Sequence, residues 1–164
     1  SAVTACSASE PASPAVVTKY PPKVAPGQPV AAIGKPVLTI IDGDRRMTFD
    51  LQGLEQLGLA ESRLFEPYVK QDITFEGVPF QDVVDYLGLR REDQIHAVAI
   101  DNYDVTIGVG DLVDSQTLVA TRSGGNAIPI ADGGATRLVF PGKPLAADMN
   151  QWIWSLDTIT ILRH

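Results

Sequence analysis

Cysteine is nearly absent from this chain. One occurs among 164 residues, at Cys6, before the part of the sequence that is patterned like a folded domain. After that position no thiol is available as a nucleophile, as a soft metal ligand or as half of a disulfide. The composition therefore excludes thiolate chemistry from the body of the protein.

Histidine and basic charge are also scarce. His96 falls in a predicted strand and His164 is the last residue, so no two histidines have metal-ligand spacing and no Ser-His-Asp set can be assembled. Lys and Arg total 13 against 20 Asp and Glu, a formal net charge of −7. This balance repels phosphate backbones and anionic lipid, so nucleic acid is not an expected partner.

Long apolar runs are missing too. No stretch approaches the roughly 18 residues of a membrane-spanning helix, so the body is not expected to span a membrane. Residues 1–34 are rich in proline, alanine and serine, which predicts a signal remnant and a flexible tether. Residues 35–164 are then expected to form one domain.

The start of the chain predicts where in the cell the protein is located. Val3-Thr4-Ala5-Cys6 is typical of the end of a bacterial lipoprotein signal, where small residues precede the lipidated cysteine. We therefore expect a periplasmic or cell-envelope protein that is anchored through Cys6. The alternatives are a plain signal-cleavage site and an alanine-rich tail in which the cysteine occurs by chance.

The body alternates short strands with a few short helices. A hairpin is expected over 37–49 around the turn at 42–44, followed by a helix capped by Asp50. A second helix is expected from Pro79, because apolar residues recur there at helical spacing up to Gly88. Further strands are expected at 73–75, 95–100, 105–109, 117–121, 127–130, 136–140 and 152–161. This pattern predicts an α+β fold with mixed β-sheets.

Several segments in order resemble the sulfite oxidase-type molybdopterin-binding fold. The matching segments are the Phe-x-Gly-Val-Pro element within 73–84, the Asp-Asn-Tyr turn at 101–105, the hairpin at 118–125, the Gly-x-x-Arg-Leu-Val strand at 134–142 and the Trp-rich end. The resemblance implies that fold and a pterin-type, molybdopterin-like cofactor. Small, exported, cysteine-free members of this family resemble pterin-binding or sensory proteins, some of them linked to membrane receptors that control cyclic-di-nucleotide signalling.

The sequence departs from the family's enzymes at their metal ligand. Those enzymes hold molybdenum partly through a cysteine that lies shortly before the Phe-x-Gly-Val-Pro element, whereas residues 61–68 here contain none. Ser62, Arg63 and Phe65 stand in that segment, and neither a hydroxyl nor a phenyl ring supplies a soft thiolate. We therefore expect a pterin site without metal, in which these three residues are candidates by position.

A pterin requires an aromatic face and polar groups at its amino and oxo edge, and a phosphate on it favours arginine. The candidate ligand contacts are Trp152, Tyr103, Asn102, Arg122, Arg137 and Lys143. Each has a simpler alternative: core packing for the tryptophan, turn chemistry for Asn102 and Tyr103, and solvated or ion-paired surface charge for the basic residues. For Arg137 the resemblance raises the expectation, because the matching arginine of the family lies near the cofactor.

Together these observations predict a non-catalytic exported protein that senses a pterin, or presents it, to a membrane signalling partner of the cyclic-di-nucleotide or kinase type. The alternative is a molybdenum-cofactor oxidoreductase that lacks the usual cysteine ligand. A structural module with a vestigial pocket is a third hypothesis.

Overall fold

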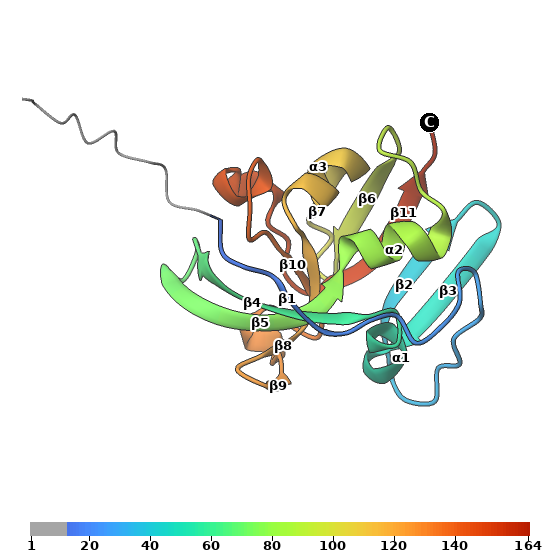
Figure 1. Cartoon of the computed structure of the whole chain (residues 1–164), viewed down its shortest axis with the longest axis horizontal. Helices are drawn as coiled ribbons and strands as arrows, with labels where there is room; N and C mark the ends of the chain where they lie inside the picture. The colour runs from blue at the N-terminus through green and yellow to red at the C-terminus, as the bar shows by residue number, and fades with distance from the viewer. Residues whose placement is uncertain (1–12) are drawn as a thin grey trace, which may run out of the picture.

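Two β-sheets form the framework of the domain, as the computed structural model shows for residues 13–164 (Figure 1). The first sheet is antiparallel and consists of β1 (Val17–Tyr20), β4 (Leu59–Glu66), β5 (Gln71–Pro79), β8 (Leu118–Ser123), β9 (Asn126–Ala127) and β10 (Arg137–Val139). The second is mixed and consists of β2 (Pro36–Asp42), β3 (Arg45–Asp50), β6 (Gln94–Ala99), β7 (Asp104–Gly108) and β11 (Leu156–Leu162). This architecture confirms the predicted α+β class.

Short helices connect the strands. They are α1 (Leu51–Glu55), α2 (Phe80–Leu87), α3 (Val109–Asp114) and the 3₁₀ turns η1 (Ile130–Asp132), η2 (Leu145–Ala147) and η3 (Met149–Gln151). Asp50 caps α1 by accepting from the backbone N–H of Gly53, and Gly88 ends α2 in the left-handed conformation that glycine adopts most readily. None of the helices in residues 13–164 has the length and apolar character of a membrane span.

The last strand, β11, is the central strand of the second sheet. It pairs in parallel with β2 and antiparallel with β6, so strands from the start and the middle of the chain lie on its two sides. In the first sheet, β5 and β8 approach so closely that a Cβ on Gly77 would overlap the backbone of Val119 and Ala120. This close approach explains why the Phe-x-Gly-Val-Pro element has glycine at position 77. Gly77 lies within β5, which ends at Pro79, directly before α2.

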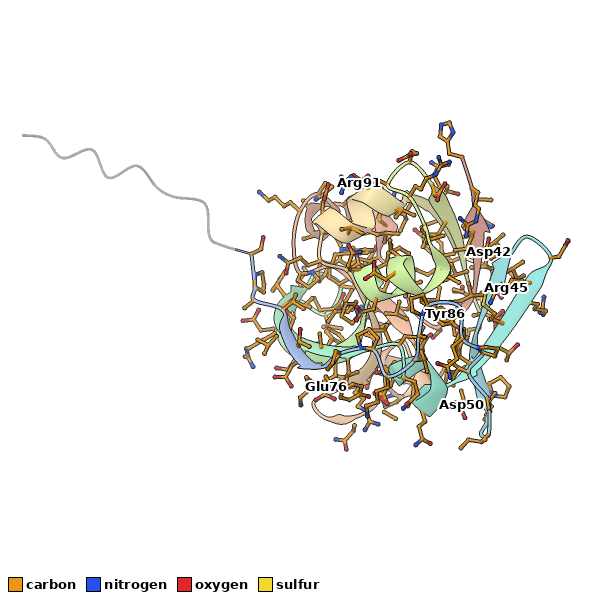
Figure 2. All side chains as sticks on the ribbon, turned by 45° about the vertical axis from the view of Figure 1, so that its right-hand side comes forward. Asp42, Arg45, Asp50, Glu76, Tyr86 and Arg91 are labelled. Carbon is orange, nitrogen blue, oxygen red and sulfur yellow. The ribbon has the colours of Figure 1, made fainter. Side chains whose placement is uncertain are left out.

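The predicted tether is wrong in its second half. Val17–Tyr20 forms β1, which pairs with β4, and Lys19 donates to the carboxylate of Glu76 at 2.8 Å. Farther along, Asp50 accepts from the backbone N–H groups of Ile33 and Gly34 at 3.0 and 2.7 Å, and Figure 2 shows Asp50 beside α1. Composition alone gave no sign of these long-range contacts. Cys6 and its predicted lipidation lie outside the described residues.

Three local expectations also differ from the structure. The predicted strand at 127–130 is divided into β9 and η1, because Pro129 stands directly before η1 and has no N–H for a β-ladder. The predicted strand at 105–109 ends one residue early, because α3 begins at Val109. The final strand begins at Leu156 instead of 152, so the Trp-rich segment before it is irregular.

Candidate functional site

An aromatic cavity of about 410 Å³ lies among the β6–β7 turn, η3 and the segment that leads into β11. Its lining residues are Tyr68, Ala99, Asp101, Tyr103, Asn150, Trp152 and Trp154. Four of the seven carry aromatic rings, and the one charged group is the carboxylate of Asp101. The volume falls within the roughly 300–1,000 Å³ that is typical of small-molecule sites.

Ile153 fixes the two tryptophans in place. It forms an isolated antiparallel bridge with Leu138 and is fully buried, so the residues on either side of it turn toward the cavity. The Trp152 ring meets Phe140 edge-on at 5.2 Å between centroids. The Trp154 ring meets Tyr68 in the same way at 6.3 Å. Both indole N–H groups are buried and have no hydrogen-bond partner among residues 13–164.

Two tyrosine hydroxyls hold η3 beside the cavity. The Tyr68 hydroxyl donates to the carbonyl of Met149 at 2.7 Å, and the Tyr103 hydroxyl donates to the carbonyl of Asn150 at 2.6 Å. Partial burial, together with nearby groups that include the Asp104 carboxylate, raises the pKa of Tyr103. This hydroxyl is therefore protonated, and able to donate, throughout the neutral range.

Asp101 gives the cavity its polar end. One of its carboxylate oxygens accepts from the backbone N–H of Tyr103 at 3.0 Å, which fixes the turn, and Asn102 between them has a positive φ of 70°. Asn tolerates this conformation better than most residues. The carboxylate retains further acceptor sites for a ligand that carries adjacent N–H donors.

A second cavity, of about 360 Å³, shares Trp154 with the first. Arg137 lies in its wall with only 2% of its surface exposed, and the guanidinium carbon is 4.5 Å from the Trp154 ring and 5.1 Å from the Phe75 ring. Its Nη2 is 3.4 Å from the carboxylate of Glu66. Burial lowers the pKa of Arg137 to about 10, which still leaves the guanidinium charged at neutral pH.

Glu66 connects this buried charge to the first cavity. The residue is fully buried, and its carboxylate accepts from the backbone N–H groups of Tyr68 and Val69 at 3.1 and 2.9 Å. The same carboxylate therefore pairs with Arg137 and fixes the turn that presents Tyr68. Two backbone donors and the buried guanidinium therefore contact this carboxylate.

The donor groups of residues 13–164 do not fit a molybdenum ion held by a thiolate. The segment that carries the cysteine in the resembled enzymes forms most of β4 and the following turn. Ser62 is buried within β4, while Arg63 and Phe65 point to solvent. Glu66, the buried acidic residue of the same segment, is already committed to Arg137 and two backbone donors. The described residues also contain no cluster of three or more His, Cys, Asp or Glu side chains suited to a metal.

The structure brings some of the predicted contacts together. Trp152 and Tyr103 line the first cavity, Asn102 lies in the turn between two lining residues, and Arg137 lines the second cavity. Arg122 lies elsewhere, because its guanidinium donates twice to the buried carboxylate of Glu55, at 3.0 and 2.9 Å. The roles of Trp152, Tyr103, Asn102 and Arg137 as ligand contacts remain predictions.

The other candidates are dispersed. Lys143 is exposed in the loop before η2, and Ser62, Arg63 and Phe65 follow the inward and outward alternation of β4. Sequence reasoning did not select five of the seven lining residues, Tyr68, Ala99, Asp101, Asn150 and Trp154. Asp101 could have been found from the Asp-Asn-Tyr turn that contains Tyr103, and Trp154 from its place two positions after Trp152, whereas no local pattern marks Tyr68 and Asn150.

Comparisons with known proteins agree on the fold. The family model described as the oxidoreductase molybdopterin binding domain matches residues 42–162. The crystal structure of the sulfane dehydrogenase SoxCD from Paracoccus pantotrophus is similar, with a TM-score of 0.57 and 17% identity over 77% of this chain and 38% of that one. The chain thus spans about two fifths of the length of that neighbour. No curated protein matches the sequence. The family match supports a pterin-type cofactor and gives no support to the expectation of a site without metal.

Proposed function

Because the chain belongs to the oxidoreductase molybdopterin-binding domain family and has the sulfite oxidase-type fold, we propose that it binds a pterin in the aromatic cavity without thiolate-dependent molybdenum chemistry. The observation that carries the proposal is the composition of the cavity, with four aromatic rings around a single carboxylate. The absence of a thiolate from every residue after Cys6 supports its non-catalytic part.

The chemistry of the cavity suits the two features of a pterin. Trp152, Trp154 and the tyrosines offer aromatic faces and edges to a flat heteroaromatic ring. The Asp101 carboxylate can accept hydrogen bonds from the ring N–H of the pterin and from the amino group beside it, because two neighbouring donors match the two carboxylate oxygens.

Ligand binding is then transmitted through η3. The Tyr68 and Tyr103 rings contact the ligand space, and their hydroxyls hold the carbonyls of Met149 and Asn150. A ligand that fixes these rings favours the conformation in which both hydroxyl bonds are made, which is a population shift of a surface turn. This mechanism fits a protein that senses a pterin, or presents it, to a signalling partner in the membrane, with the domain in the cell envelope and anchored through Cys6.

The family match favours a second candidate, a molybdenum-cofactor oxidoreductase that uses a ligand other than cysteine. Elemental analysis of protein purified from cells that make the cofactor separates the two functions. Stoichiometric molybdenum that survives gel filtration supports the enzyme and overturns the non-catalytic proposal.

Titration of tetrahydrobiopterin under anaerobic conditions tests the site, with tryptophan fluorescence as the signal. We expect Asp101→Asn to raise the Kd at least about tenfold, because a hydrogen bond to a charged group contributes roughly 1.5–3 kcal/mol. Asparagine retains the acceptor for the Tyr103 backbone N–H, so the turn survives. Asp157→Asn, at an exposed site on β11, is the matched control and leaves the Kd unchanged. A folded wild-type protein whose emission does not respond at micromolar pterin refutes the proposal.

A further inference from the structure

Exposed apolar side chains gather around the mouth of the aromatic cavity. We call this set the mouth patch, and its members are Tyr68, Val69, Ile100, Tyr103 and Met149, each between 44% and 57% exposed. Each member lines the cavity or is adjacent in sequence to a lining residue. A contiguous patch of large, exposed apolar side chains often marks an interaction site.

Hydrogen bonds make the mouth patch one surface, although its members come from three distant segments. The Tyr68 hydroxyl joins the β4–β5 turn to Met149 at 2.7 Å, and the Tyr103 hydroxyl joins the β6–β7 turn to Asn150 at 2.6 Å. Beside them, the backbone N–H of Ile100 donates to the carbonyl of Ser155 at 2.9 Å. The patch is therefore held in shape before any partner arrives, which lowers the entropic cost of binding.

The Tyr103 side of the patch is acidic. The carboxylate of Asp101 bonds to the Tyr103 backbone N–H, and Asp104 and Asp148 lie close enough to raise the pKa of the Tyr103 hydroxyl. Lys70 follows Val69, so the basic charge lies on the Tyr68 side. An apolar centre with a carboxylate rim complements a surface that carries an apolar anchor and lysine or arginine.

We propose that the mouth patch docks a second protein whose surface presents an apolar anchor flanked by basic residues on the Tyr103 side. The proposal rests on the proposed function, because the docked protein would cover the cavity and detect whether it is filled. A second copy of this chain is disfavoured, since each copy carries a formal net charge of −7 and the two would repel each other. The net charge of −7 disfavours an anionic lipid surface in the same way.

Site-specific photo-crosslinking in the native cells tests this surface. A photoreactive phenylalanine analogue is placed at Met149 or Ile100 of the full chain, and at Ile33 as control. Ile33 is 84% exposed, and its loop lies near α1, at the other end of the molecule from the 3₁₀ turns of residues 145–151 (Figure 1). We expect one discrete protein adduct at 149 and at 100, and none at 33.

The crosslinked protein is then purified and its affinity for the full chain measured by calorimetry. We expect Met149→Asp to weaken binding at least tenfold and Ile33→Asp to leave it unchanged. Asp104→Lys and higher salt should both weaken it, because the partner's basic residues face this side. An adduct of twice the chain mass, equal crosslinking at 33, or binding that Met149→Asp leaves intact overturns the proposal.

The two proposals fail in distinguishable ways. Tetrahydrobiopterin titration of the wild-type chain in the absence of the partner reports on the cavity alone. Pterin binding without a crosslinked partner overturns the docking surface and leaves the pterin site standing. If saturating pterin does not change the affinity of the crosslinked partner for the chain, the docking surface is supported and its dependence on the ligand is refuted.

Discussion

Replacing Arg137 with methionine should destabilise the protein by about 3 kcal/mol. Removal of one partner from a buried ion pair typically costs about 3–5 kcal/mol, because the remaining charge has no compensation. Glu66 is fully buried and Arg137 is 2% exposed, so little solvent screening reduces the effect. The Tyr68 and Val69 N–H groups still bond to Glu66 in the variant, which places the expected cost at the lower end of that range.

Urea unfolding followed by circular dichroism measures this change without relying on Trp154, whose ring contacts Arg137. With a slope of about 2 kcal/mol/M, the midpoint should fall by about 1.5 M. The double variant Glu66→Gln/Arg137→Met should recover most of the loss, because no buried charge then remains unpaired.

Two results would refute this reasoning. A loss below about 1 kcal/mol in Arg137→Met would mean that the pair is solvated in solution. A double variant no more stable than the single one would mean that the loss comes from packing against Phe75 and Trp154 instead of charge.

The remaining predictions concern other parts of the fold. Backbone N–H bonds, those of Gly53 and Gly34 foremost, lower the pKa of Asp50, so its contribution to stability is complete above about pH 4 and is lost as the pH falls through the lowered pKa. The stability difference between wild type and Asp50→Asn should therefore shrink in urea titrations below pH 4. Gly77→Ala should cost about 1–3 kcal/mol by forcing β5 from β8, whereas Gly108→Ala, with open space at its Cβ, should cost far less in the same assay. Tyr103→Phe should speed hydrogen exchange at residues 149–151, whereas Tyr86→Phe, which loses a hydroxyl bond to the Gln28 carbonyl far from the cavity, should not.

Local chemistry made parts of this fold predictable. The Gly43-Asp44 turn after Asp42 specifies the β2–β3 hairpin, and the helical spacing after Pro79 with Gly88 at the end specifies α2. β1 was missed because its proline-rich neighbourhood hides a strand that forms only against β4. β4 was missed because its inward alternation includes the buried charge of Glu66, which looks solvated in a sequence.

The candidate site was predictable only in part. Trp152 and Tyr103 could be selected because a pterin requires aromatic surface and turns often carry sites. Arg122 could not be set aside, since its partner Glu55 lies 67 positions away. Tyr68 and Asn150 reach the cavity through contacts between distant turns, and such contacts leave no local pattern.

The docked first strand also limits how far the domain could stand from a membrane. β1 begins eleven positions after Cys6, and a fully extended chain covers at most about 3.5 Å per residue. A lipid on Cys6 would therefore keep the domain within about 40 Å of the bilayer while Lys19 holds β1 to Glu76. Release of the chain as far as β2 would extend this reach to about 100 Å, so the β1 contacts would decide which membrane proteins the mouth of the cavity can meet.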